Sequence, residues 1–320
     1  MILVCADNLN GDVRGGAAME DLLQIRYSRI CFTLEFPEET HLPVHKVSML
    51  RGGIGEMLLQ GNCIGNRDCE KCSFAEECVV QQIYYHKLKI VPDYVQKKES
   101  LGYVYECGDT RTNYHKGDTL RFRMTLFGNV IVHFPAVLQA VYWLGMHGVG
   151  KEKARFRLIE IENHHGDKVL NRDEVCLAYL RPEMIGEYAA ERMNRGRQVV
   201  KMRFVSPLTL KHEGRFLKEF QEQALVYSIY RRIYLLNCME GNVMERKCPF
   251  QGAFEITDQR VRPVKIPRYS GTHDRVICLE GIEGEMEIRV EETFVPFLYA
   301  GELTHIGKNT SMGFGQYVVG

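Results

Sequence analysis

The chain has 320 residues, of which 45% are hydrophobic, and its formal net charge at pH 7 is +0. This length predicts two domains of about 100–150 residues each, with enough apolar side chains for a core in both. Because the net charge is zero, the overall charge indicates no particular binding partner. A basic face can still exist on a neutral protein. No stretch approaches the ~18 uninterrupted apolar residues of a membrane span. The eleven cysteines, an odd number, favour a reducing cytoplasm over a secreted disulfide framework.

The first half of the chain alternates strand and helix patterns. Residues 1–18 are rich in glycine, aspartate and asparagine, and we expect a poorly ordered extension there. A domain follows over residues 19–165. Its predicted elements are a strand at 26–36, a helix at 45–60, strands at 84–91 and 119–127, a helix at 134–144 and a strand at 154–162. The order β-α-β-β-α-β is typical of a ferredoxin-like (RRM-like) antiparallel sheet covered on one face by two helices.

The second half repeats this order. Residues 166–197 are rich in charge and poor in apolar periodicity, which indicates a linker. A second ferredoxin-like domain is expected over residues 198–320. Its predicted elements are a strand at 199–205, a long helix at 215–236, a strand at 254–264, a hairpin or two short strands within 276–290, a helix at 293–303 and a strand at 315–319. The sequence therefore predicts an α+β protein of two tandem domains.

Four cysteines follow the first predicted helix: Cys63, Cys69, Cys72 and Cys78. Four thiolates within sixteen residues of a cytoplasmic protein fit a tetrahedral metal site, most simply structural zinc. An iron–sulfur cluster is the alternative, although the spacing matches neither common ferredoxin pattern. The third interpretation is that these four cysteines are unpaired thiols in a loop. We interpret residues 63–78 as an insertion whose loop is held in place by a metal ion bound to these four cysteines.

Several short segments carry an excess of basic residues. Lys153 and Arg155 follow a glycine-rich loop at residues 145–150, Lys201 and Arg203 lie on the outward side of a strand, and Arg268 precedes Tyr269. Such clusters, with Tyr269 and Tyr317 nearby for stacking, suit a phosphodiester backbone. Any single stripe can also be a solvated strand face. Because the protein is neutral overall, the acids are then expected elsewhere, which predicts a polarised surface.

The end of the chain combines a His/Lys-bearing loop with a Gly-Phe-Gly sequence. His305 and Lys308 lie in this loop, and Gly313 and Gly315 flank Phe314. Glycines allow one backbone to approach another closely, and exposed amides together with Lys308 suit a phosphate group. Packing of this loop against a domain interface is the competing interpretation.

Taken in order, these segments resemble the RAMP superfamily, and within it the CRISPR-associated repeat-processing endoribonucleases (the sixth Cas family). The resemblance extends over residues 26–320 and is carried by Met49–Gly55, the cysteine cluster, the loop at 145–150, Ser206–Lys211 before a long helix with Arg231 and Arg232, Arg268–Ser270, Leu279–Glu285, and the terminal segment from His305 to Gly315. It implies cytoplasmic cleavage of CRISPR repeat RNA to mature guide RNA, with RNA contacts from Lys308, Arg268, Tyr269, Arg231, Arg203, Lys201, Lys153 and Arg155.

Cleavage of RNA through its own 2′-OH needs no metal, but it needs a base, an acid and a cation for the crowded phosphorane. The resemblance places a histidine near the start of the first helix, where His45 stands beside Lys46. Tyr27 on the preceding strand and His305 in the terminal loop are the further catalytic candidates. The expected product carries a 2′,3′-cyclic phosphate, with no cofactor for catalysis. The sequence pattern alone does not assign the catalytic role to one of these residues.

Two other functions remain open at the level of sequence. The chain can be a non-catalytic RAMP subunit that binds guide RNA in an effector complex with other Cas subunits. It can also be a redox protein if the cysteines hold an iron–sulfur cluster. The sequence leaves homodimer formation open and indicates no membrane partner.

Overall fold

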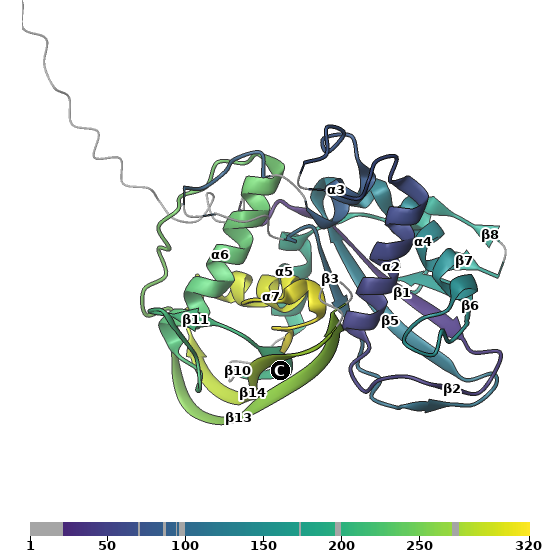
Figure 1. Cartoon of the computed structure of the whole chain (residues 1–320). Helices are drawn as coiled ribbons and strands as arrows, with labels where there is room; N and C mark the ends of the chain where they lie inside the picture. Colours follow the sequence, from purple (N-terminus) through teal and green to yellow (C-terminus); the bar gives the residue numbers. More distant parts are fainter. Residues whose placement is uncertain are drawn as a thin grey trace, which may run out of the picture.

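The computed structural model describes residues 22–320 except residues 70, 86–87, 94, 96–99, 173, 196–199 and 271–274. The side chains of residues 194, 195, 269 and 270 are also outside this set. The predicted extension at residues 1–18 therefore lies outside the described residues. Figure 1 shows two halves side by side, each with a sheet and covering helices.

The N-terminal half contains one antiparallel sheet in the order β3-β5-β1-β6-β7-β8. Its strands are β1 (Arg26–Glu35), β3 (Tyr103–Glu106), β5 (Thr119–Phe127), β6 (Arg157–Asn163), β7 (Lys168–Asn171) and β8 (Glu174–Val175), and β9 (Glu183–Met184) pairs with the start of β1. Outside it lie α2 (Val47–Asn62), α3 (Val79–Tyr84), a 3₁₀ helix (Gly128–His133), α4 (Phe134–His147), a second 3₁₀ helix (Leu177–Leu180) and the pair β2 (Thr40–His41) and β4 (Asn113–Tyr114).

Strict alternation of apolar residues decides which face of this sheet is buried. Phe32 on β1 pairs with Phe122 on β5, and their rings stack with centroids 4.8 Å apart. Leu50 and Ile54 of α2 and Val137 of α4 are buried in the same core cluster. The predicted strand at 119–127 and the helices beginning near 45 and 134 are thereby confirmed, to within a few residues.

The C-terminal half has a curved four-stranded sheet in the order β13-β14-β10-β15, with α6 and α7 on one side (Figure 1). Its elements are β10 (Val200–Leu208), β11 (Lys211–His212), β12 (Arg215–Phe216), α6 (Glu222–Glu240), β13 (Phe254–Ser270), β14 (Arg275–Val290), α7 (Val295–Thr304), a 3₁₀ helix (Thr310–Met312) and β15 (Tyr317–Val319). The long helix begins at Glu222 rather than at residue 215, because a short hairpin of β11 and β12 precedes it. The glycines at 281 and 284 do not divide β14, which pairs continuously with β13.

The predicted strand at residues 84–91 was wrong. The chain leaves α3 at Tyr84, and the strand that pairs with β5 lies later, at Tyr103–Glu106. The apolar residues Leu88 and Ile90 instead pack against the C-terminal core, and the Ile90 amide donates to the carbonyl of Cys238. The apolar pattern there reflects contact with α6 rather than a sheet.

The segment predicted as a linker, residues 166–197, contains ordered elements. It holds β7, β8, β9 and the helix α5 (Ile185–Arg195). Ile185 and Ala189 are buried, and Arg192 donates to the Glu302 carboxylate at 2.9 Å. The segment is therefore attached to both halves.

One cluster of buried residues is shared by the two halves, and a second cluster belongs to the first half alone. A single cluster of buried residues joins Leu23, Ile25 and Phe127 of the first half to Ile229 and Leu236 of α6. Arg232, also buried, donates to the carbonyls of Leu101 and Thr304 and so bridges the same junction. The stretch Gly128–His147 is long and apolar enough to cross a membrane by composition, but much of it, including Phe134, Val137 and Leu144, is buried against the sheet.

Candidate functional site

A cleft of about 650 Å³ lies between the outward face of the N-terminal sheet and the C-terminal half. The first half contributes the start of α2 and strands β1, β3 and β5, and the second contributes β10, β13, β14 and the terminal loop. The polar residues that matter most in its lining are His45, Arg121, Arg123, Ser206, Arg262 and Gln316.

Of the four predicted catalytic residues, His45 and Lys46 line this cleft, and His45 alone has an exposed side chain. It is exposed, and it stands immediately before Lys46, the N-cap of α2. Partial burial lowers the pKa of His45 below its usual 6.5, and the adjacent Lys46 charge adds to this, while Glu283 across the cleft opposes it. The imidazole is therefore mostly neutral at pH 7 and can accept a proton.

Lys46 has a different environment from the one the sequence suggested. Its side chain is only 1% exposed, and Nζ donates to the carbonyls of Asp109 and Arg111 at 2.9 and 2.6 Å. Desolvation lowers its pKa. Lys46 therefore ties the start of α2 to the loop before β4, and its ammonium group is already occupied by backbone oxygens.

Tyr27 and His305 are also buried. Tyr27 donates its hydroxyl to Glu183 at 3.0 Å, and neither residue lines the cleft. His305 is 0% exposed, with Nε2 3.4 Å from Glu106 Oε1 and Nδ1 without a partner. Burial lowers the pKa of His305. Neither side chain can touch a substrate in this arrangement, so both are suited to positioning rather than to chemistry.

Glu106 joins several of these groups at the edge of the cleft. Its carboxylate accepts from Arg29 at 2.7 and 3.0 Å and lies 3.5 Å from Arg123 and 3.4 Å from His305. Burial opposes ionisation, but Arg29 and His305 outweigh it and hold the pKa of Glu106 well below its usual value. This carboxylate connects β1, β3 and β5 to the loop that follows α7.

Arginines supply the positive charge of the cleft. Arg121 pairs with Glu162 at 2.5 Å, and Arg262 pairs with Glu283 at 2.8 Å, yet Arg121 and Arg123 are more than half exposed and Arg262 is 76% exposed. Guanidinium groups in this position can stabilise a phosphodiester from both sides. Arg121 and Arg123 alternate with buried residues along β5, so both side chains lie on its outward face, which the second half faces.

The terminal loop packs against the N-terminal half, as one of the two interpretations predicted. Gly315 has φ +71°, and a Cβ there would lie 1.8 Å from the carbonyl oxygen of Ile306. A Cβ on Gly313, at φ +81°, would lie 3.0–3.1 Å from Val47 and from the carbonyl oxygen of Tyr105. These positions require glycine because backbones and side chains approach closely.

The expected phosphate cradle is not formed by this loop. Its amides at positions 307, 308, 312, 313, 314, 315 and 316 all donate within the protein. Lys308 is exposed, with Nζ 5.8 Å from the centre of the Phe216 ring, and does not line the cleft. Tyr317 is fully buried and donates to the carbonyl of Leu298, so it is not available for base stacking.

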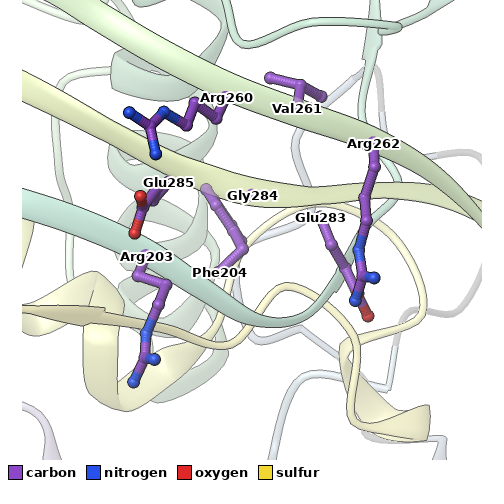
Figure 2. Close-up of a pocket in the computed structure, with 8 residues that line it drawn as sticks. All are labelled: Arg203, Phe204, Arg260, Val261, Arg262, Glu283, Gly284 and Glu285. Atoms are coloured by element: carbon purple, nitrogen blue, oxygen red, sulfur yellow. The ribbon is translucent and has the colours of Figure 1, made fainter.

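The basic strands of the second half do not form a polarised surface, which corrects that expectation. Antiparallel pairing places an acid of β14 beside each outward base: Lys201 faces Glu287, Arg203 and Arg260 face Glu285, and Arg262 faces Glu283. Figure 2 shows Glu285 between Arg260 and Arg203, and the Arg262 and Glu283 side chains pointing toward each other. The exposed face of this sheet alternates in sign.

The other predicted RNA-binding residues are spread over the molecule. Lys153 and Arg155 are exposed beyond α4, and Arg231 is half-buried on α6. Burial and the nearby charge of Arg51 lower the pKa of Arg268. The Arg268 guanidinium donates to Met312 Sδ at 3.6 Å. None of these four lines the cleft. The side chain of Tyr269 lies outside the described residues.

The four cysteines occupy one region without forming a closed metal geometry. All are partly buried and free of disulfides. Burial and the neighbouring thiols of Cys78, Cys63 and Cys72 raise the pKa of Cys69. No three of these four sulfurs lie within 4.8 Å of one another. The donor atoms of His164, His165 and Glu183 do lie that close together.

Comparisons with known proteins support a family assignment. Residues 202–317 match the family model of the CRISPR-associated endoribonuclease Cas6, and residues 23–181 match a model described as an N-terminal domain. No curated protein matches the sequence.

Solved structures resemble the chain in fold at low identity. A partial Cas6-RT-Cas1–Cas2 complex has a TM-score of 0.59 at 13% identity, over 92% of this chain and 46% of that chain. A Cas6 product complex has a TM-score of 0.53 at 14% identity, over 92% and 99%. Thermus thermophilus Cas6 has a TM-score of 0.50 at 13% identity, over 92% and 98%. The chain thus spans less than half of the first of these.

The structure is therefore a mixed α/β protein with antiparallel sheets, similar to solved Cas6 structures. The family match falls on the half that contributes β10, β14 and the terminal glycines to the cleft. Residues 202–317 are thus similar to the Cas6 endoribonuclease family, and the fold of the chain is similar to that of solved Cas6 structures.

Proposed function

We propose that this protein is an endoribonuclease that cuts CRISPR repeat RNA in the cleft between its two halves. The observation that carries the proposal is the position of His45, a neutral imidazole exposed in a cleft lined by arginines from both halves. The match of residues 202–317 to the Cas6 endoribonuclease model supports the substrate and the reaction class.

The proposed reaction is transesterification within the RNA. His45 accepts the proton of the 2′-OH at the scissile nucleotide, and that oxygen attacks the adjacent phosphorus. The bond to the 5′-oxygen breaks, and this oxygen leaves with a proton from water, whose hydroxide takes back the proton that His45 accepted. Arg123 and Arg262 stabilise the extra negative charge of the phosphorane. The products carry a 2′,3′-cyclic phosphate and a 5′-OH, and every step uses groups of the protein, water or RNA.

We also propose that each half is a ferredoxin-like domain of the RAMP type. In the first half the central strands run β3-β5-β1-β6, with α2 between β1 and β3 in the chain and α4 between β5 and β6. In the second half the order β13-β14-β10-β15 has the same relation to α6 and α7. This agreement supports a β-α-β-β-α-β arrangement in both halves.

The test is cleavage of a CRISPR repeat RNA by the full-length protein in the presence of EDTA. His45→Ala should slow cleavage by about 10²–10⁴-fold, the usual contribution of a general base. The matched control is His41→Ala, an exposed histidine that binds Asn113 and does not line the cleft. A 2′-deoxy sugar at the scissile position should block the reaction. Cleavage that stops with chelator and returns with magnesium would contradict the mechanism.

A non-catalytic RAMP subunit is the second candidate function. The burial of Tyr27, Lys46 and His305 favours it, because only one of the four predicted catalytic residues is exposed in the cleft. Such a subunit would hold guide RNA beside other Cas proteins in the cytoplasm, as the Cas6-RT-Cas1–Cas2 complex illustrates for its relative. Wild-type protein that binds repeat RNA tightly and never cuts it would establish this alternative.

We further propose that Cys63, Cys69, Cys72 and Cys78 hold a structural zinc ion. The donor set fits Zn²⁺, which prefers four thiolates at about 2.3 Å, although the sulfurs lie farther apart here than such a site requires. Metal analysis of purified protein tests this, with Cys72→Ser as the variant. A colourless protein with zinc supports the proposal, and a brown one with iron and acid-labile sulfide contradicts it.

A further inference from the structure

His164, His165 and Glu183 form a compact group away from the cleft. The two histidines lie in the turn between β6 and β7, and Glu183 lies on β9, beside the start of β1. Their ligand atoms all fall within 4.8 Å of one another, and no other such group of His, Cys, Asp or Glu occurs among the residues that the structure describes. Although His164 lies in a turn, its side chain is only 18% exposed.

Both imidazoles point at one carboxylate. His164 Nε2 lies 2.7 Å from Glu183 Oε2, and His165 Nε2 contacts Oε1 of the same group. The two rings lie close together, with centroids 4.0 Å apart and their planes tilted by 40°. Two imidazole nitrogens and a carboxylate oxygen are ligands that zinc and similar divalent ions prefer.

The surrounding residues hold this geometry in place. The Asn163 side chain accepts from the amides of His165 and Asp167, each at 2.9 Å, and donates to the Tyr179 carbonyl at 2.9 Å. This network fixes the turn that carries both histidines. From the core, Tyr27 donates its hydroxyl to Glu183 Oε2 at 3.0 Å. Hydrogen bonds of this kind orient metal ligands and raise the affinity of their sites.

We propose that His164, His165 and Glu183 bind one divalent transition-metal ion of the zinc class, with Tyr27 orienting the carboxylate and water completing the coordination. The ion would replace the direct bonds between imidazole and carboxylate. It would link the β6–β7 turn to β9 and thus to the segment that joins the two halves. This site is independent of the proposed RNA cleavage and of the cysteine cluster.

The test uses full-length, untagged protein carrying Cys63→Ser, Cys69→Ser, Cys72→Ser and Cys78→Ser, so that the cysteine cluster does not contribute. After treatment with EDTA, zinc chloride is titrated by calorimetry, and cobalt chloride is titrated by absorption spectroscopy. We expect one bound ion and a cobalt spectrum without thiolate charge-transfer bands. His165→Ala should abolish this binding. His115→Ala, which removes a histidine that is 80% exposed, should not.

Two further measurements separate ligation from a general effect on folding. Tyr27→Phe should keep one binding site but weaken its affinity by about 10–100-fold, as expected for an outer hydrogen bond. Zinc should raise the melting temperature of the parent but not of His165→Ala, whereas the two should melt alike without metal, since His165 is 45% exposed. A parent that binds no zinc, or a His165→Ala variant that binds it equally, would overturn the proposal.

Discussion

Replacing Glu106 with glutamine removes one negative charge from a place where Arg29, Arg123 and His305 meet. Glu106 is 4% exposed and Arg29 is 22% exposed, and their closest atoms are 2.7 Å apart. Breaking a buried ion pair leaves an uncompensated charge and typically costs about 3–5 kcal/mol. Because Arg29 keeps some contact with water, we take the lower end, a loss of about 3 kcal/mol in the free energy of unfolding.

Urea unfolding followed by circular dichroism at pH 7 measures this loss. The matched control is Glu255→Gln, which breaks the exposed pair with Arg289 at 3.3 Å and should leave stability nearly unchanged. Adding Arg29→Met to Glu106→Gln should restore part of the lost free energy of unfolding, because the unpaired positive charge of Arg29 is then removed. A cost for Glu106→Gln below about 1 kcal/mol, as for an exposed pair, would refute the reasoning.

The same pair gives a pH dependence with a defined sign. The pKa of Glu106 in the folded protein is held well below its usual 4.5. Its contribution is therefore fully present above about pH 4.5 and is lost as the pH falls toward the folded-state value. The difference in stability between wild type and Glu106→Gln should shrink on acidification below that point. A difference that grows instead would contradict the assignment.

Three other predictions follow from single residues. Gly315→Ala should lower the free energy of unfolding by more than about 2 kcal/mol, because its Cβ would collide with the Ile306 carbonyl, whereas Gly65→Ala, which has open space, should not. Lys46→Met should cost about 2–4 kcal/mol in the same assay, since buried carbonyls lose their donor. Because the pKa of His45 is lowered, the cleavage rate should rise with pH only below about 6.5 and level off near neutrality; a rise that continues through pH 8 would exclude His45 as the base.

The secondary structure that the sequence predicted well was the part governed by local pattern. Phe32 and Phe122 lie on strands whose alternation is strict, so the buried face of the first sheet followed directly from the residues. Leu88 and Ile90 show the limit of this reasoning. They are apolar because α6 passes beside them, and such a contact between distant segments leaves no periodic signal.

The candidate site was predictable only in part for the same reason. The place of His45 before the first helix indicated a cleft residue, and the structure exposes it there. The neighbouring Lys46 looked equally suitable, yet its side chain folds inward onto carbonyl groups from a loop about sixty residues later. Likewise, the acids beside Lys201 and Arg203 come from β14, and only strand register reveals that they neutralise the basic face.

The common core of the two halves has a consequence for how the protein can move. Tyr27 and Phe127 from the first half are buried in the same apolar cluster as Ile229 and Leu236 from the second. Parting the halves would expose that cluster to water, at about 25 cal/mol for each Å². The two halves should therefore stay docked in the folded protein, and the first half has a second apolar cluster of its own. Under the proposed function, the RNA therefore has to adapt its shape to a cleft whose two walls are held together by this cluster.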